Sequence, residues 1–259
     1  MRHRSPLCFC LSSALALFVA LVPSSALAGG LTVQLEPIKD NTLYEDGGDV
    51  SNGAGEYLFA GQTANTNNNL LRRAVLAFSL TGNIPSDAVI TSVTLDMTMS
   101  MSIVGEANVA LHRLTADWGE GTSDAPGQEG RGTDATSGDA TWLNTFFGGG
   151  TWTTAGGDFA PTASATVGVA GNDTYTWGTT SALVADVQAW VDNPSSNYGW
   201  IVLGDETLPP PTTKRFNSRE NGTAEERPSL TVNFTSPGLI FIDGFESGDT
   251  AAWTNLIQQ

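Results

Sequence analysis

The segment Val89–Met101 constrains the fold most, because its polar and apolar residues alternate strictly from Ser92 onward. A period of two is the repeat of an extended strand with one buried face. The segment therefore predicts a long, half-buried β-strand. Its two faces are Val93, Leu95, Met97, Met99 and Met101 on the apolar side and Thr94, Asp96, Thr98 and Ser100 on the polar side.

The other apolar segments are short, and turn residues separate them throughout the chain, which contains 29 Gly and 12 Pro. This pattern favours an all-β fold, a two-sheet β-sandwich of jelly-roll type with long Gly/Ser/Thr-rich loops, over a helical or βαβ fold. The Gly- and Ser-rich segment 119–140 is expected to be a long surface loop or insertion. Further strands are expected at 31–35, 57–60, 74–78, 109–111, 162–169, 173–177, 198–203 and 229–234.

One short helix is predicted at 181–192. Its apolar residues recur at helical spacing, and Asn193-Pro194 ends the pattern. Ser181 is the expected N-cap, because a serine hydroxyl can accept a hydrogen bond from the first turn. The residues of the expected buried face are Leu183, Val184, Val187, Trp190 and Val191.

Residues 1–28 have the features of a secretory signal peptide. Arg2 and Arg4 precede an apolar run, and Ala26-Leu27-Ala28 is a small-residue cleavage site. The alternative, an uncleaved membrane anchor, needs a longer apolar run than this one. We therefore expect a secreted protein, extracellular or at the cell surface. Both cysteines lie within this segment, so the mature chain is expected to contain no disulfide.

The mature chain is strongly acidic. Without Arg2 and Arg4, nine basic residues face 27 acidic ones, a net charge of −18. Such a surface excludes nucleic acid as a partner, because phosphate binding requires clustered Lys and Arg. It also disfavours acidic glycans unless a local positive patch or a bridging cation intervenes. The candidate patch consists of the pairs Arg72-Arg73 and Lys214-Arg215.

Few residues suit catalysis. His112 is the single histidine after the signal segment, and no nucleophile elbow, metal-protease or phosphate-loop motif occurs. Glu225-Glu226 and Asp205-Glu206 are adjacent residues, which point to opposite sides of an extended chain and rarely form an acid–base pair. We therefore expect a non-enzymatic protein with His112 facing outward on a strand. A hydrolase or lyase with an unrecognised site is the alternative.

Structural calcium is the one cofactor that the composition allows, since calcium binds carboxylate and amide oxygens. Asp40, Asn52 and Glu220 are the candidate ligands, on the assumption that the terminal strands are neighbours. The competing interpretation pairs Glu220 with an arginine, either Arg72 or Arg219, and needs no ion. A second acidic group lies in the tail, at Asp243, Glu246 and Asp249.

Carbohydrate binding commonly relies on exposed aromatic rings that stack on sugar C–H faces. Trp142 and Trp152, in the Gly- and Thr-rich region after the long loop, are the candidate platforms, and Asp158 is a candidate polar contact. The alternative for both tryptophans is packing within the loop. Trp190 and Trp200 are expected in the core and Trp118 as a structural cap.

The ordered motifs resemble those of the DNRLRE-type domain family. The likeness extends over about 31–235, and it implies a jelly-roll β-sandwich that usually serves as a non-catalytic module; some relatives bind alginate. The motifs are Pro37-Ile38-Lys39-Asp40-Asn41-Thr42-Leu43, Trp118-Gly119-Glu120-Gly121, Asp186 to Trp190, Asn197-Tyr198-Gly199-Trp200, and Arg215-Phe216-Asn217-Ser218-Arg219-Glu220.

We therefore expect a signal peptide at 1–28, a DNRLRE-like domain at 29–235, and a linker with an acidic, aromatic tail at 236–259. The tail segment Ile240–Trp253 resembles an ending seen on exported proteins of Gram-negative bacteria. The expected function is binding of an extracellular polysaccharide or cell-surface glycan, without an integral membrane span after cleavage. The alternative is a structural or adhesive cell-surface protein attached through its tail.

Overall fold

The computed structural model describes residues 30–64, 70–207, 209 and 211–236. The expected signal peptide at 1–28 and the tail at 237–259, with its second acidic group, lie outside these residues. Ser236 is the last described residue, and its hydroxyl donates a 2.7 Å hydrogen bond to Asp87.

The described chain is built mainly of antiparallel strands, with one α-helix and two short 3-10 helices. The predicted all-β, two-sheet sandwich with one short helix is confirmed. In chain order the elements are β1 (Leu31–Leu35), β2 (Pro37–Tyr44), β3 (Val50–Ser51), β4 (Tyr57–Gln62), β5 (Leu71–Phe78), β6 (Val89–Ser102), β7 (Ala107–Arg113), β8 (Thr133–Asp134), β9 (Ala165–Val169), β10 (Asp173–Trp177), α1 (Ser181–Asp192), η1 (Pro194–Ser196), β11 (Trp200–Leu203), β12 (Lys214–Asn217), η2 (Ala224–Glu226) and β13 (Ser229–Thr235).

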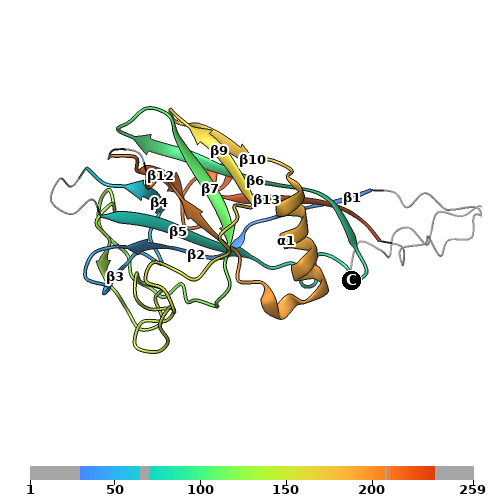
Figure 1. Cartoon of the computed structure of the whole chain (residues 1–259), viewed down its shortest axis with the longest axis horizontal. Coiled ribbons are helices and arrows are strands. Elements are labelled where there is room, and N and C mark those ends of the chain that lie inside the picture. Colours follow the sequence, from blue (N-terminus) through green and yellow to red (C-terminus); the bar gives the residue numbers. More distant parts are fainter. Residues whose placement is uncertain (1–29, 65–69, 208, 210, 237–259) are drawn as a thin grey trace, which may run out of the picture.

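The strands form two facing layers (Figure 1). Sheet A contains β1, β13, β6, β10, β12 and β4, and the long strand β6 is its centre. Asp96 in β6 pairs with Ser229 of β13 and Thr176 of β10, so these two strands lie on opposite edges of β6. Sheet B has the order β2-β5-β11-β7-β9. The layers join where Gly61 and Gln62, at the end of β4, pair with β5.

The main core lies between the sheets and follows the alternation seen in the sequence. Val93, Leu95, Met97 and Met99 are fully buried there, together with inward residues of both sheets. Met101, expected on the same face, is exposed instead; it pairs with Arg215 of β12, next to the irregularity that shifts the register between Met99 and Met101. The helix α1 contributes Leu183, Val187, Trp190 and Val191 to this core.

A second core covers the outer face of sheet B. The segment 114–160 folds back over β2, β5 and β11 (green to olive beneath β2 in Figure 1). Trp118, Trp142 and Trp152 pack there against Leu43, Val75 and Ile201. The expected surface loop 119–140 is therefore partly an interior layer: Ala125 and Ala140 in it are buried.

Within the described residues, the outer face of sheet A has such a cover only over β4 and β12, where Phe59 and Arg215 are buried and Arg215 bonds to Gln128 of the long loop. The outward side chains of β1, β13, β6 and β10 are half-buried or exposed, as expected for a layer facing water. No helix in the described part of the chain combines the length and apolar character needed to span a bilayer.

The helix boundaries agree with the sequence prediction, and one detail is corrected. The N-cap is Thr180 rather than Ser181, because the Thr180 hydroxyl accepts a 3.0 Å hydrogen bond from Leu183 N. Asp186 attaches the helix to β11 and β7, two neighbouring strands of sheet B. One carboxylate oxygen accepts from Trp200 Nε1 at 3.0 Å, and the other lies 3.2 Å from Arg113 Nε.

Asp186 should therefore be the most sensitive polar position of the helix. Asp186→Ala leaves the Trp200 indole N–H and Arg113 without their partner, so we expect the free energy of unfolding to fall by about 2–3 kcal/mol. Asp192→Ala, at a solvent-facing position of the same helix, should change it by less than about 0.5 kcal/mol. Urea unfolding followed by tryptophan fluorescence measures both, and equal effects would contradict this role.

Candidate functional site

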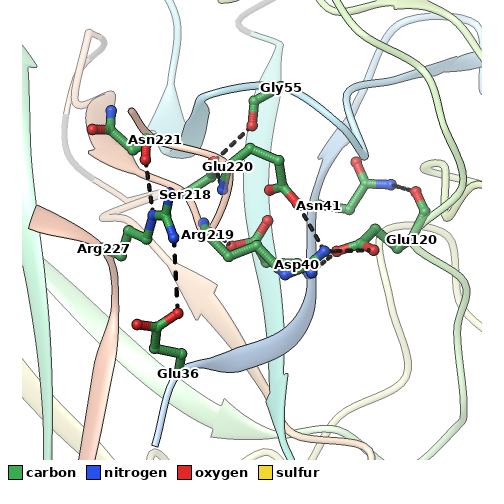
Figure 2. Close-up of polar contacts among 10 residues, drawn as sticks. All are labelled: Glu36, Asp40, Asn41, Gly55, Glu120, Ser218, Arg219, Glu220, Asn221 and Arg227. Atoms are coloured by element: carbon green, nitrogen blue, oxygen red, sulfur yellow. Dashed lines mark hydrogen bonds and ion pairs between the residues drawn. The ribbon is translucent and has the colours of Figure 1, made fainter. Parts of the chain in front are cut away.

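Three carboxylates and one guanidinium meet at the start of β2. We call Asp40, Glu120, Arg219 and Glu220 the acid–arginine cluster (Figure 2). Asp40 comes from β2, Glu120 from the loop after β7, and the other two from the turn after β12. One oxygen of each carboxylate lies within 4.8 Å of the others. The cluster therefore joins three segments that are far apart in the sequence.

The guanidinium of Arg219 is shared by two acids. Its Nη1 lies 2.9 Å from both carboxylate oxygens of Glu120 and 2.7 Å from Glu220 Oε1. The backbone N–H of Arg219 donates to Asp40 Oδ2 at 2.8 Å. Asp40 N in turn donates to Glu120 Oε1 at 2.8 Å. Glu220 is thus in the arginine pair that the competing interpretation described, with Arg219 as its partner.

The cluster is partly buried, and its three carboxyl groups outnumber its single guanidinium. Burial, followed by the charge of Glu220, raises the pKa of Asp40 well above its usual value, although the N–H of Arg219 opposes this. Burial also raises the pKa of Glu220, against the effect of Arg219. The other oxygen of Glu220, Oε2, is buried without a hydrogen-bond partner among the described residues. Asp40 and Glu220 therefore bind protons more tightly than free carboxyls.

A second buried carboxylate, Glu129, holds the long loop next to the Asn-Gly turn. It accepts hydrogen bonds from Asn52 Nδ2 at 2.8 Å and from the backbone N–H of Tyr57 at 2.9 Å. Burial raises its pKa, while these donors lower it. Its φ of 59° is left-handed, which is strained for a glutamate. Gly53 must be glycine here, because a Cβ would lie 1.7 Å from Glu120 O.

The expected calcium ligands do not assemble as a set. Asp40 and Glu220 come together, but both polar atoms of the Asn52 amide are engaged elsewhere: Oδ1 accepts from Ala125 N, and Nδ2 donates to Glu129. Glu120 takes the third place. The Arg219 guanidinium already lies among the carboxylates, where a calcium ion would have to bind. The cluster as built does not fit calcium.

The two basic pairs form no surface patch. Arg72 is buried, with its guanidinium over the Tyr44 ring and Nε bonded to Gly130 O. Arg73 lies on the opposite face, in a two-pronged 2.7 Å pair with Glu206. Lys214 is 0% exposed, and Nζ lies 2.6 Å from Gly105 O. Arg215 stacks on Tyr57 and bonds to Gln128. All four charges are therefore used internally.

The proposed stacking platforms are also buried. Trp142 and Trp152 are 9% and 5% exposed, so neither presents a free ring face to a sugar. Arg73 covers the Trp142 ring, and Trp152 Nε1 donates to Thr141 O at 2.9 Å. Asp158 caps its own turn by accepting from Thr153 N and Thr154 N. These residues build the cover over sheet B from within.

The histidine has a packing role. His112 Nδ1 lies 2.8 Å from Ala160 O, and its ring meets Phe159 edge-on. No carboxylate contacts it in the described structure. Sequence reasoning missed Glu120 and Glu129 as the buried acids that anchor the loop. The Trp118-Gly119-Glu120-Gly121 corner was a signal for Glu120, whereas nothing in the sequence marks Glu129.

Comparison with known proteins leaves the chain without an assigned family. No protein-family model matches it, and no curated protein shows significant sequence similarity to it.

Removal of the shared guanidinium should destabilise the cluster. In Arg219→Met, Glu120 and Glu220 lose their counter-charge, and we expect the free energy of unfolding to fall by about 2–3 kcal/mol. This is less than for a fully buried pair, because Arg219 is partly exposed. Arg131→Met, at an exposed arginine without a described side-chain partner, is the matched control. The wild-type melting temperature should be the same in EDTA and in calcium chloride; a clear rise with calcium would show that an ion binds.

The raised pKa values of the buried carboxyl groups also make the free energy of unfolding depend on pH. Above the ordinary carboxyl pKa of about 4, the native protein keeps protons on Asp40, Glu129 and Glu220 that the unfolded chain has released. The contribution of these groups to stability is therefore lost as the pH rises through their native pKa values. Asp40→Asn removes one such group, so its free energy of unfolding should fall less steeply with pH. Urea unfolding from about pH 4 to about pH 8 tests this, and a steeper fall in the variant would contradict the assignment.

Proposed function

We propose that the protein is an exported, non-catalytic β-sandwich module that binds a neutral extracellular polysaccharide on the outer face of sheet A. The observation that carries the proposal is the difference between the two outer sheet faces. A loop layer with three tryptophans covers sheet B, whereas β1, β13, β6 and β10 of sheet A present their outward side chains to solvent. The resemblance to DNRLRE-type modules supports the same class of function.

We call the outward side of β1, β13, β6 and β10 the open face of sheet A, and its side chains are mostly hydrogen-bonding groups. Its outward side chains form cross-strand rows, and the registers place Thr32 beside Asn233 and Ser92, and Gln34 beside Thr231 and Thr94. A third row contains Ser229, Asp96 and Thr176, and Thr98 pairs with Thr174 beyond it. Rows lie about 7 Å apart and strands about 4.8 Å apart. Hydroxyls and amides both donate and accept, as sugar hydroxyls do.

The charges of the chain favour a neutral ligand. Of the nine basic residues in the described part of the chain, eight make ion pairs, hydrogen bonds or ring contacts within the protein. Arg131 is the exception. The described residues therefore include no cluster of free cationic side chains for alginate or another polyanion, and the acidic excess repels such chains.

The contacts of the buried acids, of His112 and of Lys214 support a non-catalytic role. The buried acids of the described chain lie in structural contacts with Arg219 or with backbone N–H groups. Catalysis needs an acid, base or nucleophile that a substrate can reach. His112 lies against Ala160 O and the Phe159 ring, and Lys214 is enclosed.

Affinity electrophoresis in gels containing neutral polysaccharides (a β-glucan, a mannan, a galactan) or alginate tests the function. We expect retardation by at least one neutral polysaccharide and none by alginate. Thr94→Lys places a long charged side chain in the middle of the open face and should weaken binding at least about tenfold, by about 1.4 kcal/mol.

Thr166→Lys is the matched control, because Thr166 is an exposed strand threonine of β9 in sheet B. It should bind as the wild type does. Retardation that is equal in both variants would move the binding surface away from sheet A. Absence of retardation by every neutral polysaccharide would overturn the proposed function.

A further inference from the structure

A pocket lies at one corner of the open face of sheet A. Two segments line it: Gln34–Glu36, at the end of β1, and 224–229, which leads from η2 into β13. Its volume is about 490 Å³, within the range of small-molecule sites. Gln34 Nε2 donates to Ser229 Oγ at 2.8 Å at its rim, and both residues also belong to the open face. The pocket and the face are therefore continuous.

One hydrogen bond holds the Arg227 side chain in place, and its other N–H donors have no hydrogen-bond partner among the described residues. Its Nε donates to Asn221 O at 2.8 Å, and its Nη1 lies 3.9 Å from Glu36 Oε2, which is too long for a hydrogen bond (Figure 2). A guanidinium carries five N–H donors. In the described structure, only the Nε–H of Arg227 has a hydrogen-bond partner. The remaining donors have no protein acceptor among the described residues, and Arg227 is one of the residues that line the pocket.

The acceptors of the pocket are equally accessible. The Glu36 side chain is 65% exposed, and Glu225, which also lines the pocket, is exposed as well. Each carboxylate offers two oxygens to hydroxyl donors. Leu35 and Pro228, both buried, supply an apolar part of the lining. Planar polar side chains around an apolar surface suit a ring with hydroxyls on its rim and C–H groups on its face.

We propose that this pocket binds one sugar residue of a neutral glycan whose chain continues along the open face of sheet A. Arg227 donates to ring or hydroxyl oxygens, and Glu36 accepts from neighbouring hydroxyls. Two carboxylates and one guanidinium give the pocket a formal charge of −1, so a sugar acid is disfavoured. This assignment rests on the proposed function and gives it a subsite.

Isothermal titration with neutral hexasaccharides (β-1,4-glucose, β-1,4-mannose and β-1,3-glucose) tests the subsite. Glu36→Gln and Arg227→Gln should each weaken the binding of the hexasaccharide that the wild type recognises at least about tenfold. Glu36 is exposed, so Glu36→Gln should fold normally, and its melting curve checks this. Arg131→Gln is the control for the loss of one positive charge and should bind as the wild type does.

The outcomes separate the two proposals. Wild-type affinity in both pocket variants, together with weakened binding in Thr94→Lys, would overturn the subsite and leave the function of the open face intact. No binding of any neutral hexasaccharide or polysaccharide by the wild type would overturn both. If Arg227→Gln fails to fold, Glu36→Gln alone decides. Tighter binding of glucosamine than of glucose oligosaccharides would identify an amine site instead and overturn the neutral-sugar assignment.

Discussion

The guanidinium of Arg219 is the interaction on which this arrangement depends. It bonds to Glu120 and Glu220 at 2.7–2.9 Å, while its own backbone N–H bonds to Asp40. These contacts join β2, the loop after β7 and the turn after β12. A carboxylate buried without such a partner costs several kcal/mol. The loop that covers sheet B is therefore held at its beginning by charge and, further along, by Glu129.

The burial of indole rings beneath this loop gives the two sheets different outer surfaces. Trp118, Trp142 and Trp152 fill the space over β2, β5 and β11, so sheet B has a core on each side. Sheet A has its core on the inner side, and the outward side chains of β1, β13, β6 and β10 are mostly polar, with threonine and serine the commonest. This asymmetry is the reason for which we propose sheet A as the ligand-binding side. It also explains why tryptophans in a Gly-rich region are poor guides to a binding surface.

Basic residues that are adjacent in a strand point to opposite faces of the sheet and have different surroundings. Arg72 and Arg73 are adjacent in β5, and they stack on different rings, Tyr44 and Trp142. Lys214 is enclosed, whereas the next residue, Arg215, faces Tyr57 and Ser100. A basic pair within a strand therefore cannot form one patch, because its members point to opposite faces. The two-residue repeat of a β-strand, which located the strands, was therefore sufficient to argue against one patch made of these two pairs.

The sequence by itself determined most of the strands, the helix at 181–192 and four of the five expected inward residues of β6, because local hydrophobic periodicity decides which face of an element is buried. It also predicted that Asp40 and Glu220 lie near each other. Only the tertiary structure decided that Arg219 lies among them, that Asn52 turns to Glu129, and that Trp142 and Trp152 are interior. These features are contacts between segments up to about 180 residues apart. They depend on loop placement and charge pairing, for which a sequence carries no periodic signal.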